Sequence, residues 1–492
     1  MRSPTRTSLG LAALLVLAAC GGGDSGGGGD ADNGADVAGG TEVVTPDGTA
    51  TDETDEADDV DSGGSDGSAP VDGAVVSLLS PDLGLYAVDR DSGEHRALTL
   101  DGVGWVERDT QPIAATTSAF TVSLTTLEGE SYAHDLGVVR IDLDSGDAID
   151  VAELGVDRES DESEHLTRWE VLDADDTTVW LETSAFTGEG ASIVGFDATT
   201  GETTATFDDL DFEITTDEGS TCSGTAEGLL VMPDGVLMTT TSGWPAELDP
   251  PTGGIEMVFD WCGFGVEPTL ADFVDSADAA EWLVTEDGSA VSAEAAEAVL
   301  PFVRLRAAPS GGRGLAEGDG SIWWLFVSGT TIPDGEENVS AYTGGVVRFD
   351  PAAGAVVDVW PLGDATATYL HDEDQADDGM TTVSTMSSFD LRYLDGALWI
   401  MDHRDDAPLR RLDPVTGELT EVTIEKGDGI DLTATEMIFS DPEAIWLDVV
   451  RKVITRDDED GRSTSGTSFV ERVDSSTGTI VVSVPVADIL GF

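Results

Sequence analysis

The stretch Arg411-Leu412-Asp413-Pro414-Val415-Thr416-Gly417-Glu418 has the pattern of a tight turn between two β-strands. Asp413 is a favoured first turn residue, because its carboxylate accepts hydrogen bonds from the backbone N–H groups just ahead of it. Pro414 sets the φ of the next position, and Gly417 supplies the positive φ with which the chain re-enters a strand. Polar and apolar residues then alternate over residues 418–424, which is the period of a strand.

This Asp-to-Gly corner recurs along the chain, and we interpret every copy as a structural turn. The seven copies begin and end at Asp89 and Gly93, Asp142 and Gly146, Asp197 and Gly201, Asp249 and Gly253, Asp350 and Gly354, Asp413 and Gly417, and Asp474 and Gly478. Successive aspartates are 53, 55, 52, 101, 63 and 61 positions apart. Four tryptophan-containing strands precede corners, at residues 178–181, 321–325, 397–400 and 444–447, and residues 235–238 occupy the same place without tryptophan.

Short strands with turns at fixed offsets and a period of 50–60 residues are typical of a β-propeller, in which each repeat forms one four-stranded blade. Seven corners predict an all-β protein of seven four-stranded blades. Because one blade cannot bury both of its faces, the ring must close, and we expect residues 74–79 and 479–484 to lie side by side. The 101-residue interval contains either a degenerate eighth blade or an insertion.

The interval favours a small helical insertion at about residues 267–300. Residues 292–300 are rich in Ala and Glu, begin at Ser292, a good N-cap, and are followed by Pro301, which stops a helix. This segment lacks the corner pattern. We therefore expect one propeller domain over residues 73–492, with the insertion inside it.

The N-terminus indicates export. Residues 1–20 join a short basic start, with Arg2 and Arg6, to an apolar run too short to span a bilayer. The run ends at Leu17-Ala18-Ala19-Cys20-Gly21, which resembles the lipobox of bacterial lipoproteins, where the cysteine carries a lipid such as palmitate. The alternative is an ordinary secretory signal. Residues 21–72 are Gly, Asp and Ser rich, so we expect a disordered acidic tether between a membrane lipid and the propeller.

Charge limits the partners. The formal net charge is −77, which excludes general binding to nucleic acid, since that binding needs Lys and Arg to neutralise phosphates. The same acidity suits a salty habitat, where salt screens the self-repulsion. With Cys20 assigned to lipid, Cys222 and Cys262 remain as an even pair in an oxidising compartment, and we predict a disulfide between them.

The repeats resemble bacterial propellers of the virginiamycin B lyase-like, NHL-like and quinoprotein-like (PQQ-binding-like) kinds. The best matches are Val347-Arg348-Phe349-Asp350-Pro351 and residues 411–418. The resemblance covers roughly residues 73–492 and implies the propeller fold. It implies little about function, because the shared motifs are turn and packing signatures.

Few residues have the pattern of a catalytic or metal site. His371 and His403 are candidates for the rim of the central tunnel, and the alternative for His403 is a loop histidine that bonds neighbouring aspartates. Asp89 with Asp91, and Asp142 with Asp144, place carboxylates two positions apart as in oxygen-ligand loops, which suggests Ca²⁺. The other corners lack the second aspartate, so the repeat is chiefly a turn. The blade tryptophans are expected to be core residues.

The sequence therefore predicts a lipid-anchored propeller on the outer face of a bacterial membrane or on the cell surface. We expect a binding or scaffolding module for a protein, glycan or small ligand. We assign no cofactor beyond the suggested Ca²⁺ and favour a module that is not an enzyme. The alternatives are an extracellular enzyme of the lyase or quinoprotein kind and a purely structural envelope component.

Overall fold

Strands make up most of the chain described by the computed structural model. The described residues are 70–78, 84–100, 105–106, 111–126, 133–154, 167–185, 192–207, 211–215, 221–232, 235–240, 246–249, 254–257, 268–275, 278–285, 291–305, 314–334, 337–362, 389–403, 407–425, 427, 429–457 and 461–489. All of them belong to one unit of the chain.

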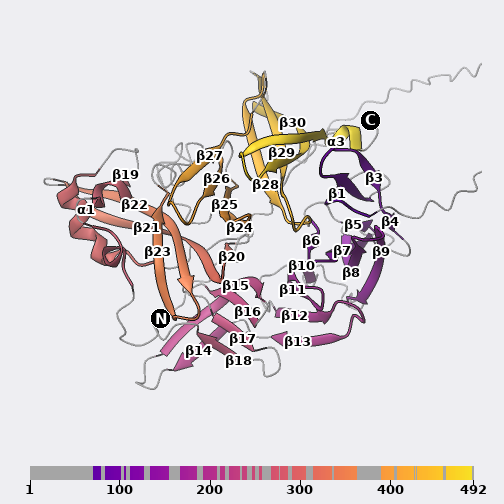
Figure 1. Ribbon diagram of the computed structural model, residues 1–492, viewed down its shortest axis with the longest axis horizontal. Coiled ribbons are helices and arrows are strands. Elements are labelled where there is room, and N and C mark those ends of the chain that lie inside the picture. Colours follow the sequence, from indigo (N-terminus) through magenta and orange to yellow (C-terminus); the bar gives the residue numbers. More distant parts are fainter. Residues whose placement is uncertain are drawn as a thin grey trace, which may run out of the picture. The chain divides into compact units, whose positions relative to one another are not determined.

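Seven sheets follow one another in chain order (Figure 1). The first contains β1 (Gly73–Leu78), β2 (Gly84–Asp89) and β3 (His95–Ala97). The second contains β4 (Thr99–Leu100), β5 (Trp105–Val106), β6 (Ile113–Ala114), β7 (Ser118–Thr126), β8 (Ala133–Asp142) and β9 (Asp147–Glu153). The third contains β10 (Thr167–Ala174), β11 (Thr178–Ala185), β12 (Ser192–Asp197) and β13 (Thr203–Phe207).

The remaining four sheets carry the second half of the chain. The fourth contains β14 (Asp211–Thr215), β15 (Thr221–Met232), β16 (Gly235–Thr240), β17 (Ala246–Asp249) and β18 (Gly254–Met257). The fifth contains β19 (Val284–Thr285), β20 (Leu315–Gly318), β21 (Ser321–Asp334), β22 (Glu337–Asp350) and β23 (Ala355–Pro361). The sixth contains β24 (Phe389–Leu394), β25 (Ala397–Asp402), β26 (Leu409–Leu412) and β27 (Leu419–Val422), and the seventh contains β28 (Leu432–Ile438), β29 (Ile445–Asp457), β30 (Gly461–Asp474) and β31 (Thr479–Pro485).

Each sheet packs against the next, and the last packs against the first. Separate buried apolar clusters join sheets one and two, two and three, four and five, five and six, and six and seven. β10 of the third sheet lies against β15 of the fourth. The ring closes where Ala74 and Val76 of β1 share a cluster with Trp446 and Val482 of the last sheet, so the first and last strands lie near each other as expected. The fold is a β-propeller.

The predicted count of seven or eight four-stranded blades is not confirmed. Six sheets contain at least four strands, whereas the first contains three. The Asp89–Gly93 corner joins β2 to β3, while the other described corners join the third and fourth strands of a blade. Among the residues that the structure describes, the first sheet therefore lacks the innermost strand. No eighth sheet occurs in the described part of the chain, where an insertion accounts for the long interval.

Side chains occupy the place of the missing inner strand. The backbone N–H of Val75 donates to Ser440 Oγ at 3.0 Å, and that of Ser77 donates to Gln111 Oε1 at 3.1 Å. Gln111 Nε2 donates in turn to the carbonyl of Ser77. A buried strand edge must find such partners, because an unpaired backbone group in the interior is costly. The ring is therefore closed at its axis by side chains from the neighbouring blades.

The corners are turns, as predicted, in the six copies that the structure describes. In each, the aspartate Oδ1 accepts one or two backbone N–H groups from the following three residues. The closing glycine has a positive φ in every one, for example 72° at Gly417 and 67° at Gly478. Asp249 ends β17 and pairs with Gly254, while Gly253 lies outside the described residues.

The tryptophans of the second strands are core residues, as predicted. Trp323, Trp399 and Trp446 are fully buried. The strand register places each opposite an arginine of the third strand, at positions 348, 411 and 472. The guanidinium lies 5.4 Å from the ring centre for Arg348 over Trp323, and 5.9 Å for Arg411 over Trp399. In these two blades the Trp and Arg therefore form a cross-strand cation–π pair.

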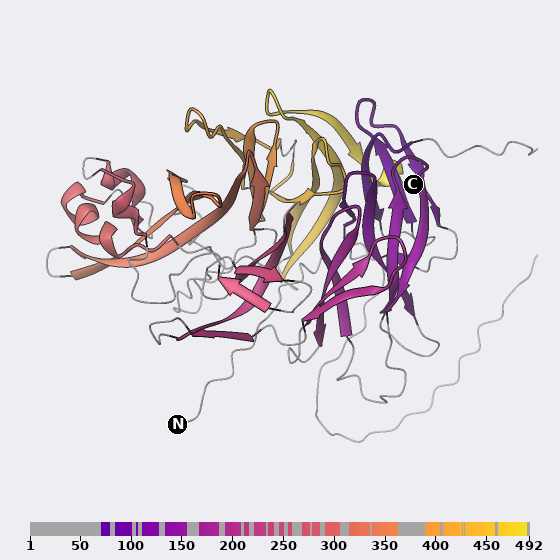
Figure 2. The same ribbon diagram turned by 60° about the horizontal axis from the view of Figure 1, so that its bottom comes forward.

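The segment between the fourth and fifth sheets is helical (Figure 2). It contains η2 (Leu270–Asp272), η3 (Ala279–Trp282), α1 (Ala293–Val299) and η4 (Leu300–Phe302), and a last short helix, α3 (Val486–Ile489), follows β31. Ser292 caps α1, with its Oγ accepting the N–H of Ala295, as the sequence predicts. The helices pack on Trp324 and Phe349. They cover the face of the fifth sheet that looks toward the fourth.

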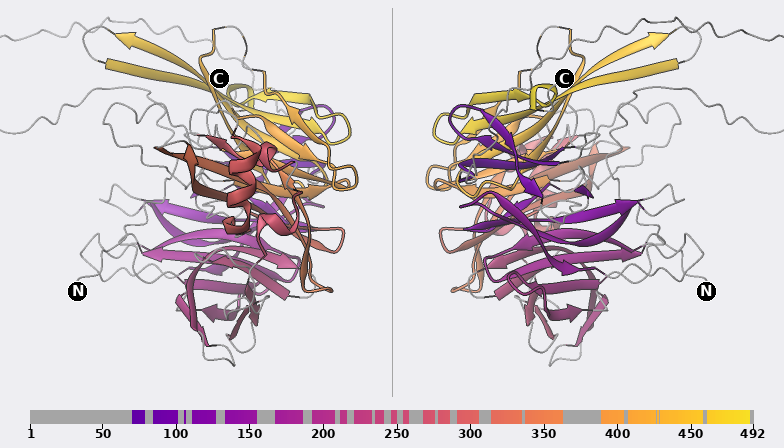
Figure 3. Two further views of the ribbon diagram at one scale, coloured as in Figure 1. Left: turned by 90° about the vertical axis from the view of Figure 1, so that its left-hand side faces the viewer. Right: turned by 90° about the vertical axis from the view of Figure 1, so that its right-hand side faces the viewer.

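Two blades carry extended hairpins. β21 and β22 pair over 14-residue strands, and β29 pairs with β30 from Ile445 to Asp457. The β29–β30 hairpin projects beyond the rest of its sheet (Figure 3), because its neighbours β28 and β31 pair only as far as Lys452 and Phe469. In the described residues no helix is long and apolar enough to cross a membrane.

Candidate functional site

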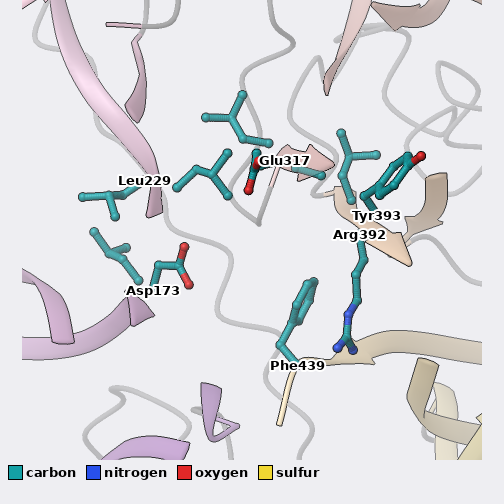
Figure 4. Close-up of a pocket in the computed structure, with 11 residues that line it drawn as sticks. Asp173, Leu229, Glu317, Arg392, Tyr393 and Phe439 are labelled. Carbon is teal, nitrogen blue, oxygen red and sulfur yellow. The ribbon is translucent and has the colours of Figure 1, made fainter. Parts of the chain in front are cut away.

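The inner strands of neighbouring blades enclose a pocket of about 160 Å³ (Figure 4). Its walls come from β10, β15, β20 and β24, and from Phe439 just after β28. The lining residues are Leu172, Asp173, Leu229, Leu230, Leu315, Ala316, Glu317, Leu391, Arg392, Tyr393 and Phe439. They stand near the C-terminal ends of these strands, just before the hairpin turns. The pocket therefore lies toward the end of the ring that carries the Asp-to-Gly corners.

Asp173 is held at a β-bulge in β10. Its Oδ1 accepts the N–H of Ala174 at 2.9 Å, and its Oδ2 accepts the N–H of Val231 in the next blade at 2.7 Å. Asp173 therefore joins the third and fourth blades and places its carboxylate at the pocket wall.

Arg392 joins the sixth and seventh blades. Its Nη1 donates to the carbonyl of Ala444 at 2.8 Å, and its Nη2 donates to the carbonyl of Asp441. The guanidinium carbon lies 5.8 Å from the ring centre of Phe439. Figure 4 shows the side chain running past Phe439, with the guanidinium turned away from Glu317. These bonds direct its N–H groups toward the protein backbone.

Glu317 and Tyr393 border the pocket from the fifth and sixth blades. Glu317 is exposed, and it forms no hydrogen bond or ion pair with any residue in the described part of the chain. The Tyr393 ring stacks on Trp323 with centres 5.8 Å apart, and it fills the space where any side chain at Gly318 would lie. Gly318 therefore permits the close approach of these two blades at the pocket.

His403 lies toward the opposite end of the ring, directly after β25. Its Nε2 is 2.7 Å from Oδ2 of Asp390, a buried residue of β24 that also accepts the N–H of Met437 in the seventh blade. Burial alone would lower the pKa of His403, but the charge of Asp390 and its hydrogen bond, with Glu436 and Asp402, raise the pKa to about 9. At neutral pH the side chain is therefore an imidazolium that pairs with Asp390, rather than a base.

This ion pair predicts a pH-dependent stability. A histidine with a raised folded pKa adds stability that is fully present below the unfolded value of 6.5 and is lost as pH rises through about 9. We expect His403→Gln to lower the free energy of unfolding at pH 6 by at most about 3 kcal/mol. The deficit should vanish by about pH 10. Denaturant titrations from pH 6 to pH 10 measure it, with the exposed His95→Gln as control; a deficit independent of pH would refute the assignment.

Of the two histidines predicted at the tunnel rim, the structure describes only His403. His403 is bonded to Asp390, which is distant in sequence, instead of to the neighbouring aspartates that one interpretation favoured. It does not line the pocket. His371 lies outside the described residues.

The predicted calcium loops gain no support. Asp91 and Asp144 are exposed, and the Asp89 carboxylate accepts the N–H groups of its own turn and the Ser92 hydroxyl. In the described ranges no group of three or more His, Cys, Asp or Glu side chains is placed to hold a metal ion. The calcium site therefore stays a prediction.

The cysteine predictions are not tested. Cys20 and Cys262 lie outside the residues that the structure describes, and Cys222 lies in β15, paired in register with Ile214. The Cys222–Cys262 disulfide, the signal peptide and the tether stay predictions.

The pocket residues were not identified from the sequence. One signal was available: Asp173 and Glu317 each stand two positions before an aspartate that opens a turn, and Arg392 stands three before Asp395. Charged residues at this place in an inner strand differ between blades, unlike the corner residues. An alignment of the first strands of the repeats would have singled them out.

Comparisons with known proteins give no family. No protein-family model matches the chain, and no curated protein matches it. BamB from Moraxella catarrhalis is 12% identical, with 82% of this chain and 94% of that chain covered and a TM-score of 0.30. Sqt1 from Saccharomyces cerevisiae is 10% identical, with 85% and 82% covered and a TM-score of 0.31.

A quinoprotein alcohol dehydrogenase-like protein from Bacteroides thetaiotaomicron is likewise 10% identical, with 85% and 94% covered and a TM-score of 0.29. Likenesses at these values assign no function.

Proposed function

We propose that this chain is an exported, lipid-anchored β-propeller that acts as a binding module and takes its partner at the central pocket. The pocket carries the proposal. It combines apolar walls with a few charged groups, the usual composition of a binding site, and its lining comes from several blades. Asp173 and Arg392 are bonded between blades, whereas Glu317 is exposed at the pocket. Asp173 and Arg392 therefore hold the blades around the pocket, and the exposed Glu317 carboxylate is available to bind a partner.

The lipid anchor rests on residues 17–21, and the acidic segment at 21–72 supplies a tether. As a flexible coil, about 50 residues span roughly 40 Å on average, and more when like charges repel. Such a tether lets the propeller search the space near the membrane for a partner. This arrangement favours a module that captures a partner over one that must stay fixed in an assembly.

The anchor predicts lipid labelling at one cysteine. Cells fed an alkyne fatty acid should label the wild-type protein, and Cys20→Ser should abolish the label, because the thiol is the attachment atom. Cys222→Ser is the matched control and should keep the label. Gel fluorescence after azide coupling measures it, and a label that persists in Cys20→Ser would contradict the anchor.

Blocking the pocket should abolish partner capture. Glu317 is exposed, so Glu317→Trp fills the pocket mouth with little expected effect on folding. We expect affinity capture from envelope extracts with the full chain to lose its specific partner by at least about tenfold, the effect of losing one well-packed contact. Glu418→Trp, the same change at an exposed corner, should retain it. Equal capture by both variants would rule out the pocket as the binding site.

A further inference from the structure

The size of the pocket limits its occupant. The pocket has a volume of about 160 Å³. Drug-sized ligands occupy sites of about 300–1,000 Å³. The pocket volume therefore suits one side chain or a molecule of similar size.

The charges of the pocket favour a cation. Two carboxylates, Asp173 and Glu317, line it together with one guanidinium, that of Arg392. The guanidinium donates to two backbone carbonyls and covers the Phe439 ring, so its hydrogen-bonding capacity is directed away from the pocket. Glu317 has no such partner in the described residues. The Glu317 carboxylate would repel an incoming anion, whereas an incoming cation would find in it a hydrogen-bond acceptor.

The walls suit a long apolar stem. Five leucines line the pocket, together with Phe439 and Tyr393. Lys and Arg bury their methylene stems on apolar surface while the charged head seeks a carboxylate or an aromatic face. A short hydrophobic side chain would pack against the apolar walls but leave the Glu317 carboxylate without a binding partner.

We infer that the pocket receives the side chain of a lysine or arginine from a partner protein. The inference rests on the proposed function, since it names the chemistry of the partner taken at that site. The charge of the whole chain agrees: a net charge of −77 favours a basic partner over an acidic one, within the short range that salt leaves unscreened. That general attraction brings a basic partner near, and the pocket selects one side chain.

Methyl NMR of the full chain with labelled leucines tests this inference. The probes are n-butylammonium and butyrate, which match in shape and differ in charge, each added at constant ionic strength near 150 mM. We expect n-butylammonium to shift the methyl signals of Leu229, Leu230 and Leu391 with saturation, and butyrate to leave them unchanged. Glu317→Gln should weaken n-butylammonium binding by about tenfold, the value of a lost charged hydrogen bond. Glu418→Gln should not.

The outcomes separate the inference from the proposed function. Equal binding of both probes, or shifts that grow without saturation over the whole surface, would overturn the cationic preference. If neither probe binds while Glu317→Trp still abolishes partner capture, the cation inference fails and the binding module stands. If neither probe binds and Glu317→Trp captures normally, both fail.

Discussion

Replacing Asp441 with alanine is expected to lower the free energy of unfolding by about 3–5 kcal/mol, the usual cost of removing one partner from a buried ion pair. The side chain of Asp441 is fully buried between the first and last blades. Arg90 donates to it through Nε at 3.1 Å and Nη2 at 2.9 Å, across 351 positions of sequence. Trp446 Nε1 also donates to it, at 2.8 Å. The variant would lose the bond that ties the start of the ring to its end.

Glu443→Ala is the matched control, because it removes another carboxylate bonded to the same arginine. Glu443 lies 2.6 Å from Arg90 but is 70% exposed, so its loss should cost at most about 1 kcal/mol. Denaturant unfolding followed by tryptophan fluorescence measures both. Equal effects of the two variants would refute the closing role of Asp441.

The pH dependence gives a second check. Burial alone would raise the pKa of Asp441, but hydrogen bonds from Arg90, the N–H of Glu443 and Trp446 lower it below 3.8. The stabilisation is therefore present above pH 3.8 and lost as pH falls through the lower folded value. The gap between wild type and Asp441→Ala should be constant at pH 5–7 and should shrink below about pH 4.

The second large effect is expected at Trp323. This fully buried side chain stacks between Trp360 and Tyr393, with ring centres 5.6 Å and 5.8 Å away, and lies under Arg348. Trp323→Ala should lower the free energy of unfolding by about 3–5 kcal/mol, because it leaves a cavity between the fifth and sixth blades. Tyr393 borders the pocket, and it would move when its stacking partner is lost. The NMR methyl signals of the leucines that line the pocket should therefore also shift.

Trp360→Ala removes a partner from the same stack, but Trp360 is only half-buried. We expect it to cost less than Trp323→Ala and to leave the pocket signals unchanged. Differential scanning calorimetry compares the two. A Trp323→Ala variant as stable as Trp360→Ala would contradict the role of Trp323 as the packing centre of that interface.

Local sequence predicted the elements whose chemistry lies within a few residues. The Asp413–Gly417 corner forms because its carboxylate, its backbone N–H groups and its glycine are neighbours in the chain. Ser292 caps α1 for the same reason. The buried Trp strands followed from the repeat, since seven similar segments must pack on one another. Arg348 and Arg411 were visible in the motif, although their stacking on the tryptophans opposite them was not.

The sequence by itself determined the all-β propeller, its corners, its tryptophan-rich blade contacts and the helical insertion, because these depend on short-range turn chemistry and on a period. Only the tertiary structure decided which blade lacks an inner strand, how Asp441 closes the ring on Arg90, and that Asp173, Glu317 and Arg392 meet at one pocket. Those features join residues tens to hundreds of positions apart. No local sequence pattern specifies these long-range contacts, since they form only when the ring of blades closes.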